Sequence, residues 1–230
     1  MSENSNKNRA WLRRMRFAIP LLLIPLCAVL GTVLFDEKRH MFVSVAVAFL
    51  SLAFFYLGFE EKNTGSRRAV IVSVMIALSV IGRFIPLLKP VTAITVICAV
   101  YLGAESGFLV GSLSALLSNI AFGQGPWTPF QMLAWGIIGL LAGVFAKMLK
   151  KSRTALIAYG ALSGIAFSLV MDVWTTLWYS GGFDTALYLS ALLTSLPHTL
   201  IYAVSNVIFL YVMAKPMGEK LDRIIVKYGI

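Results

Sequence analysis

Long uncharged apolar runs recur along the chain from residue 17 to residue 214. The runs 17–35 and 41–59 each hold 19 residues without one charged side chain. A helix needs about 20 apolar residues to cross a bilayer, whereas barrel strands would alternate apolar and polar residues. The pattern predicts an all-α integral membrane protein built as a helical bundle. Eight transmembrane helices are expected, at about 17–35, 41–59, 69–87, 92–103, 106–121, 131–147, 154–179 and 186–214.

The boundary between the fifth and sixth helices is located by glycine and proline residues, because no charged residue marks it. Residues 106–146 contain no charged side chain, and a single membrane helix does not use 41 residues. The stretch 123–129 reads Gly-Gln-Gly-Pro-Trp-Thr-Pro, and glycine and proline at that density end a helix. A loop is therefore expected there, between two helices.

The distribution of basic residues predicts the orientation. Lysine and arginine number five in 1–16, three in 60–68, four in 147–153 and four in 215–227, all on one side of an eight-span topology. The other side carries only Lys38, Arg39 and Lys89. Because cytoplasmic loops are enriched in basic residues, both termini are expected in the cytoplasm. If the short fourth span did not cross, the seven-span alternative would put the C-terminus outside and spoil this asymmetry.

Composition removes several other classes of function. The chain is 59% hydrophobic and 13% charged, so its net charge of +10 indicates membrane topology rather than binding of nucleic acid. No phosphate-binding loop of the ATPase type and no zinc-protease or serine-hydrolase motif is present. The two cysteines, Cys27 and Cys98, lie inside apolar spans and suit neither a disulfide framework nor a metal site. No metal and no cofactor is expected.

Three stripes of small residues follow four-residue spacing, which puts each on one face of a helix. Such faces let another helix approach closely. Packing inside the bundle is the favoured interpretation for any one stripe, and at least one stripe is a candidate docking face for a partner subunit. The stripes are Ala69, Ser73 and Ala77; Gly103, Gly107, Gly111 and Ala115; and Gly160, Gly164 and Ser168.

Two charged residues, Arg83 and Asp172, fall well within predicted spans, in their outer halves. A charge inside a membrane is costly unless it is paired or hydrated, so each residue is a functional candidate. An ion pair between Arg83 and Asp172 that joins two helices is an equally weighted alternative. Arg83 is also near enough to the end of its span to reach the interface.

Aromatic and amide side chains gather around the predicted 123–129 loop. Trp174 and Trp178 lie four residues apart on one helix face, just beyond Asp172, and with Trp127 and Trp135 they could line an apolar outer pocket. The alternative is a belt of aromatic residues at the membrane interface. The predicted substrate-binding residues are Arg83, Asn119, Gln124, Trp127, Thr128, Gln131, Trp135, Asp172, Trp174 and Trp178.

The string FGQGPWTPFQMLAWG over residues 122–136, followed by IIGLLAG, resembles the substrate-binding (S) components of energy-coupling factor (ECF) transporters. The stripe Ala69, Ser73 and Ala77 resembles the motif with which such proteins dock on their coupling subunit. The resemblance covers roughly residues 67–213. It divides the chain into an N-terminal tail with a two-helix addition, 1–66, and a six-helix domain, 67–230.

This resemblance implies a multi-pass protein of a prokaryotic plasma membrane that captures a vitamin on the outer face. It implies partners, namely a transmembrane coupling subunit and two ATPases, and no catalysis by this chain itself. The tryptophan-rich loop most resembles members assigned to cobalamin or its precursors. Two alternatives come from the residues themselves: an intramembrane enzyme that uses Asp172 and His198 as acid–base groups, and a membrane assembly protein.

Overall fold

The computed structural model describes residues 16–34, 39–60 and 65–230, and every regular element in these ranges is helical. The basic residues Lys7, Arg9, Arg13, Arg14, Lys38 and Lys62 lie outside the described residues. The elements are a π-helical turn η1 (Ile19–Leu23), α2 (Ile24–Leu34), α3 (His40–Glu60), α4 (Gly65–Gly82), α5 (Val91–Leu102), α6 (Ala104–Phe122), α7 (Thr128–Val144), α8 (Ala146–Lys151), α9 (Arg153–Ser180) and α10 (Thr185–Tyr228).

Each predicted span contains a helix, and the largest departures from the predicted bounds are the C-terminal ends of α4 and α10. α4 ends at Gly82 instead of residue 87, so Arg83 is the first residue after the helix rather than one inside it. α10 continues to Tyr228, passing through Pro197 and Pro216, where the last span was expected to end near residue 214. Its 44 residues correspond to about 66 Å, roughly twice the hydrocarbon thickness of a bilayer.

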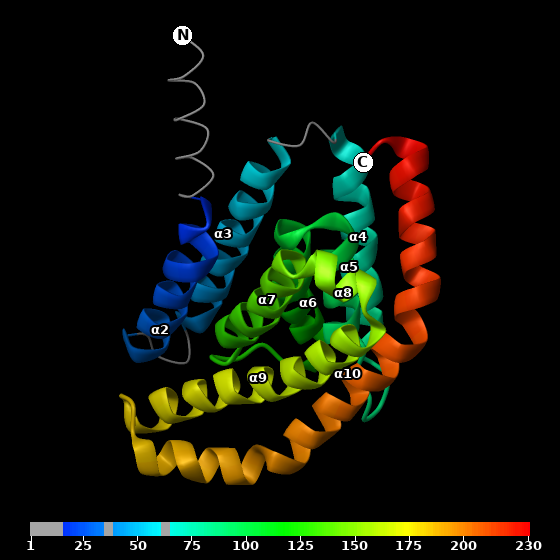
Figure 1. The fold of residues 1–230 in the computed structure, drawn as a ribbon. Coiled ribbons are helices and arrows are strands. Elements are labelled where there is room, and N and C mark those ends of the chain that lie inside the picture. The colour runs from blue at the N-terminus through cyan, green and yellow to red at the C-terminus, as the bar shows by residue number, and fades with distance from the viewer. Residues whose placement is uncertain (1–15, 35–38, 61–64) are drawn as a thin grey trace, which may run out of the picture.

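Within the described residues, four helices are long and apolar enough to cross a membrane: His40–Gly58, Ala104–Phe122, Arg153–Ser180 and Thr185–Tyr228. Three shorter apolar segments accompany them, Ile19–Leu34, Val91–Leu102 and Thr128–Val144. Figure 1 shows α2 to α7 running alternately down and up the bundle, while α9 and the first part of α10 lie side by side across its lower end.

The short helix α5 lies at the centre of the bundle. Its 12 residues span only about 18 Å, and nearly all of its side chains are buried against α4, α6, α7 and α10. Because protein rather than lipid surrounds α5, its short length is tolerated at membrane depth. The short fourth segment is thus a core helix of the fold.

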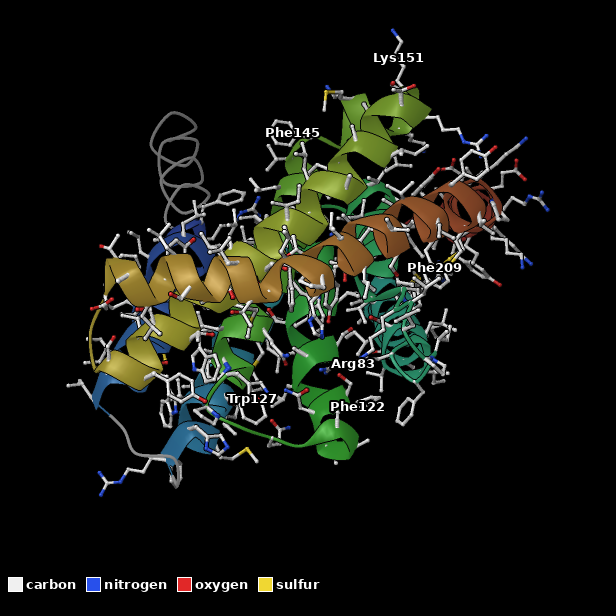
Figure 2. All side chains as sticks on the ribbon, turned by 90° about the horizontal axis from the view of Figure 1, so that it is seen from below. Arg83, Phe122, Trp127, Phe145, Lys151 and Phe209 are labelled. Atoms are coloured by element: carbon white, nitrogen blue, oxygen red, sulfur yellow. The ribbon has the colours of Figure 1, made fainter. Side chains whose placement is uncertain are left out.

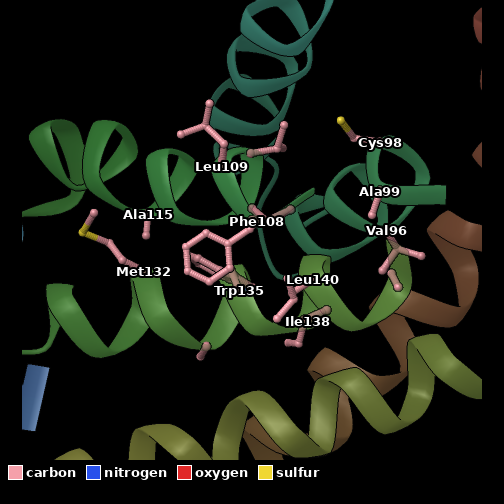
Figure 3. Close-up of a cluster of buried hydrophobic side chains, with 14 of the residues drawn as sticks. Val96, Cys98, Ala99, Phe108, Leu109, Ala115, Met132, Trp135, Ile138 and Leu140 are labelled. Atoms are coloured by element: carbon pink, nitrogen blue, oxygen red, sulfur yellow. The ribbon is translucent and has the colours of Figure 1, made fainter. Parts of the chain in front are cut away.

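Glycines bring α6 and α7 into close contact beside α5. A Cβ atom on Gly111 would lie 2.3 Å from the carbonyl oxygen of Trp135, and one on Gly139 would lie 2.3 Å from that of Gly107. Figure 3 shows the side chains around this seam, with Phe108 beside Trp135 and Ala115 above Met132. Backbone-to-backbone packing of this kind fixes the position of the loop that joins the two helices.

The N-terminal helices α2 and α3 cover one side of the six-helix unit, and α4 stands on the other side (Figure 1). Glu105 of α6 forms ion pairs with both sides. Its Oε1 lies 3.1 Å from Nη2 of Arg16, just before η1, and its Oε2 lies 3.6 Å from Nη2 of Arg68 on α4. All three side chains are buried. Gly58 of α3 packs directly on Glu105, since a Cβ there would lie 2.4 Å from its Cγ.

Candidate substrate-binding site

Arg83 is the centre of a buried polar network at the lower end of the bundle. The backbone N–H of Arg83 bonds to Ser79 and Val80, which continues the last turn of α4 and points the side chain toward α6. Only 7% of Arg83 is exposed, although it carries a full charge. Its Nη1 donates to Ser118 Oγ at 2.5 Å and to Asn119 Oδ1 at 2.6 Å.

Aromatic rings complete the surroundings of this guanidinium. Its carbon lies 5.1 Å from the ring centroid of Phe122 and 5.3 Å from that of Trp135, within the range of cation–π attraction. Lys89, in the α4–α5 loop, approaches the same Phe122 ring, and its ammonium nitrogen lies 5.3 Å from the ring centroid. Burial and the charge of Arg83 lower the pKa of Lys89. This corner of the molecule is therefore positive and contains no carboxylate among the described contacts of Arg83.

Asn119 connects Arg83 to the α6–α7 loop. Its Nδ2 donates to Thr128 Oγ1 at 2.9 Å and to Gln131 Oε1 at 2.8 Å. Thr128 in turn donates to Gln124 Oε1 at 3.1 Å, and Gln124 Nε2 donates to the carbonyl of Leu116 at 2.7 Å. Five of the ten predicted site residues thus form one continuous network.

The loop itself is held in a single tight path. Gly123 has φ +98°, a conformation that L side chains rarely adopt, and it lets the chain turn away from α6. The ring of Trp127 lies over Gly125, where a Cβ would come within 2.2 Å of Cη2. Pro129 occupies the first turn of α7, where its missing N–H costs nothing. The predicted break at 123–129 is confirmed as a short loop.

The tryptophans separate into two groups. Trp127 contacts Trp174 edge to face, with centroids 6.0 Å apart, and Trp174 stacks with Trp178 at 6.3 Å. Trp135 is fully buried, stacks on Phe167 with centroids 4.7 Å apart, and lies beneath Arg83. Three of the four tryptophans named in the sequence thus form one cluster, and the fourth, Trp135, lies in the core beneath Arg83.

A small cavity adjoins the α6–α7 loop. A cavity of about 10 Å³, room for one water at most, lies between the N-terminal hairpin and the loop, with Thr32, His40, Pro126 and Trp178 in its wall. The N-terminal hairpin therefore contacts the same loop as the site. Figure 2 shows Arg83, Phe122 and Trp127 near one another at the end of the molecule far from Lys151.

Asp172 lies outside the network. It is buried, and its Oδ2 accepts a hydrogen bond from Ser195 Oγ at 2.7 Å, which joins α9 to α10. Arg83 bonds to α6 instead, so the proposed Arg83–Asp172 ion pair is not formed in the described residues. His198, the other residue of the enzyme hypothesis, is exposed on α10, and no hydrogen bond in the described residues joins it to Asp172.

Several buried donors at the site have no acceptor. Arg83 Nε, Trp135 Nε1 and Trp174 Nε1 make no hydrogen bond to any residue that the structure describes. Buried polar groups are nearly always paired, and an orphaned donor needs an explanation such as a missing ligand or water. Two of these donors are adjacent, because Arg83 lies over the ring of Trp135.

Comparison with known proteins agrees with this architecture. Residues 63–219, from just before α4 into the extended α10, match the family profile described as ECF-type riboflavin transporter, S component. The chain belongs to this family of S components. A UPF0397 protein from Aliivibrio salmonicida (strain LFI1238) is 27% identical over 150 residues, covering 61% of this chain and 79% of the relative. No solved structure matches the chain.

S components are multi-pass membrane proteins of transporters, and the apolar helices of this chain fit that location. As the family model begins at residue 63, η1, α2 and α3 lie before the matched region. The matched region contains the α6–α7 loop and the whole Arg83 network. Thus the polar network belongs to the shared S-component unit.

Of the three small-residue stripes in this S component, two are internal. Gly107 and Gly111 pack on α7, while Gly160 and Gly164 pack on α10, where a Cβ on Gly164 would lie 2.6 Å from the backbone nitrogen of Ala203. The third stripe faces outward. Ser73 and Ala77 are exposed and Ala69 is half-buried, and they are flanked by the exposed side chains of Val70, Val74 and Leu78.

Sequence reasoning missed some residues that complete the site. Ser118 and Phe122 both contact Arg83, and Lys89 lies against the same ring. Ser118 is the neighbour of the predicted site residue Asn119, and Phe122 is the first residue of the 122–136 string. Their closeness in sequence to these features is the signal that could have identified them. The buried Glu105 was also missed, because it lies just before the expected start of the fifth span.

Proposed function

We propose that the chain is the substrate-capturing subunit of an ECF-type importer, which binds a vitamin at the Arg83 end. The observation that carries the proposal is the set of orphaned donors, Arg83 Nε, Trp135 Nε1 and Trp174 Nε1, next to a rigid amide network. A ligand with several acceptor atoms on an aromatic frame would satisfy donors and rings together.

Riboflavin is the substrate we favour, because the family profile bears its name and its chemistry suits the site. Its flat ring system carries, along one edge, two carbonyl oxygens and two unsubstituted ring nitrogens that accept hydrogen bonds, with an N–H donor between the carbonyls. A flat ring needs only a parting of the Trp127, Trp174 and Trp178 side chains, which now touch.

Cobalamin, the substrate that the loop first indicated, makes larger demands on the site. A corrin with its axial groups is bulky in three dimensions, so it would need a larger displacement of the packed Trp127, Trp174 and Trp178 rings than a flat ring would. Cobalamin therefore remains the alternative that a binding panel has to separate from riboflavin. We propose that all ten predicted positions contact the substrate. Asp172 makes its hydrogen bond to Ser195 and not to the Arg83 network.

The orientation we propose puts the Arg83 site on the outer face and both chain ends in the cytoplasm, with eight crossings. Arg67, Arg68, Lys150 and Arg153 lie at the helix ends opposite the site, and an excess of basic residues is typical of the cytoplasmic side. This arrangement brings substrate in from outside and leaves the opposite end for the energising subunits.

The partner surface that we propose is the outward stripe of α4. Ala69, Ser73 and Ala77 are small enough for another helix to approach, and none of the helices in the described part of the chain covers Ser73 or Ala77. The expected partner is a transmembrane coupling subunit that works with two ATPases, since the chain has no nucleotide-binding motif of its own.

The proposal is tested by equilibrium dialysis of the purified chain against a vitamin panel that includes riboflavin and cobalamin. We expect one tight binder, and Trp174→Phe should weaken it about tenfold, because the ring is kept while one N–H donor worth about 1–2 kcal/mol is lost. Trp178→Phe is the matched control, since the Trp178 N–H is not among the orphaned donors.

Two results would count against the proposal. Binding of no panel member by a folded protein would remove the vitamin assignment. Equal weakening by the Trp174 and Trp178 variants would show that the aromatic rings matter but the orphaned donor does not, and would remove the observation on which the site rests.

A further inference from the structure

A second, larger cavity lies at the end of the molecule remote from Arg83. It measures about 290 Å³ and is enclosed by α5, α8, the beginning of α9 and the middle of α10. Figure 2 shows Lys151, on its rim, and Arg83 at opposite ends of the view. The vitamin site therefore does not account for this cavity.

The floor of the cavity is apolar. Ile97, Leu149 and Leu210 contribute to it, and each is about 1% exposed, so the floor is continuous with the bundle core. Tyr101 closes one side with its hydroxyl against α10, where a Cβ on Gly218 would lie 2.1 Å from the Tyr101 oxygen. The base of the cavity is thus a preformed hydrocarbon surface.

The rim of the cavity is basic. Lys150 is neutralised by Asp222, with its Nζ 2.6 Å from Oδ1. Arg153 donates to the carbonyl of Tyr211 at 3.0 Å and lies 3.9 Å from the centroid of the Tyr211 ring, without a carboxylate partner in the described residues.

Two further lysines on this rim carry charge that the fold leaves uncompensated. Lys151 and Lys215 line the cavity and have neither a hydrogen bond nor an ion pair within the part of the chain that the structure describes. The remaining acid of the wall, Glu219, lies 3.9 Å from Arg223. The rim therefore presents an excess of positive charge above an apolar base.

We propose that this cavity binds the headgroup of an anionic phospholipid, with the phosphate between Lys151, Lys215 and Arg153. The start of the acyl chains would lie along Leu149 and Leu210. Basic pockets between membrane helices on the cytoplasmic side are suited to anionic headgroups. Free phosphate shares the charge but not the hydrocarbon, and it would leave the apolar floor unused. The inference does not depend on which vitamin the outer site takes.

The test is native mass spectrometry of the full chain in detergent, with phosphatidylglycerol and phosphatidylcholine of identical acyl chains added in turn. We expect retention of phosphatidylglycerol in preference to phosphatidylcholine. Lys151→Gln with Lys215→Gln should reduce this preference by about fivefold for each lysine. The pair Lys151→Arg and Lys215→Arg should retain it, because the charge is kept.

The matched control is Lys147→Gln with Lys220→Gln, an equal change of charge at exposed lysines outside the cavity wall. Equal loss in this control would overturn the proposal, as would the absence of any preference for the anionic lipid. Displacement of the lipid by inorganic phosphate at millimolar concentration would assign the site to a soluble anion instead. Unchanged lipid preference together with lost co-purification of a coupling subunit would make it a protein-docking surface.

Discussion

Arg83 illustrates how a buried charge is accommodated without an opposite charge. Its guanidinium bonds to a hydroxyl and an amide oxygen and lies over two aromatic rings. The sequence indicated Arg83, Asn119, Thr128, Gln124 and Gln131 as site residues, and the structure joins them. It could not indicate the partner of Arg83, because a span boundary shifted by a few residues rotates the side chain toward another helix.

Replacing Asn119 tests the network at its junction. Asn119→Leu keeps the number of side-chain heavy atoms and the branching at Cγ but removes the acceptor for Arg83 and the donors to Thr128 and Gln131. Unpaired buried groups cost about 1–3 kcal/mol, so the free energy of unfolding should fall by about that amount. Thermal denaturation in detergent measures it. Ser190→Ala, which removes an exposed bond to Ala186 within one helix, should have almost no effect, and equal melting temperatures would contradict the role of Asn119.

At the level of helices, four-residue spacing defines a face but not what lies opposite. All three small-residue stripes look alike in the sequence, yet the α6 and α9 stripes are internal and the α4 stripe is exposed. The same limit explains α10. The charges after residue 214 suggested a tail, whereas Gly218 and Leu221 are buried and Lys220 and Arg223 are exposed, as on an amphipathic helix that leaves the membrane.

The seam between α6 and α7 should tolerate no added side chain. Gly111→Val would place Cβ 2.3 Å from a backbone carbonyl oxygen, which cannot move without shifting α7. We expect a loss of about 1–3 kcal/mol in the free energy of unfolding, measured by denaturation in detergent. Ala77→Val on the exposed face of α4 is the matched control and should leave stability unchanged. A Gly111 variant as stable as the Ala77 variant would disprove the close packing.

The α4 stripe should matter for assembly rather than for folding. Ser73→Trp adds bulk to an exposed surface, so the isolated chain should keep its melting temperature and its vitamin affinity. Co-purification with a coupling subunit should fall at least tenfold. Ser190→Trp, an equal addition at an exposed position of α10, should not reduce it. Normal assembly of the Ser73 variant would move the partner surface elsewhere on the molecule.

At the scale of the whole molecule, the sequence indicated two N-terminal helices added to a six-helix unit but not where they sit. Their place depends on Arg16 meeting Glu105 and on α3 packing over that carboxylate. These contacts join segments far apart in the chain, and neither residue lies in a pattern that predicts the other. The hairpin covers α6, α7 and α9 and leaves the outer side of α4 open.

The proposed orientation can be measured by cysteine labelling in intact cells. In a background with Cys27→Ala and Cys98→Ala, Gly182→Cys in the α9–α10 turn should react with a maleimide that does not cross membranes. Lys227→Cys near the end of α10 should react only after the cells are opened, because the positive ends of the helices face the cytoplasm. Labelling of both positions in intact cells would contradict a crossing by α10 and a cytoplasmic C-terminus.

The placement of the indole rings also gives the molecule an optical property. Four of its five tryptophans, Trp127, Trp135, Trp174 and Trp178, lie at or beneath the proposed vitamin site. With centroids 6.0 and 6.3 Å apart, Trp127, Trp174 and Trp178 are close enough to pass excitation among themselves. A ligand that absorbs at their emission wavelength and stacks on any one of these rings will quench the fluorescence of all three. Intrinsic tryptophan fluorescence can therefore measure ligand binding without a label.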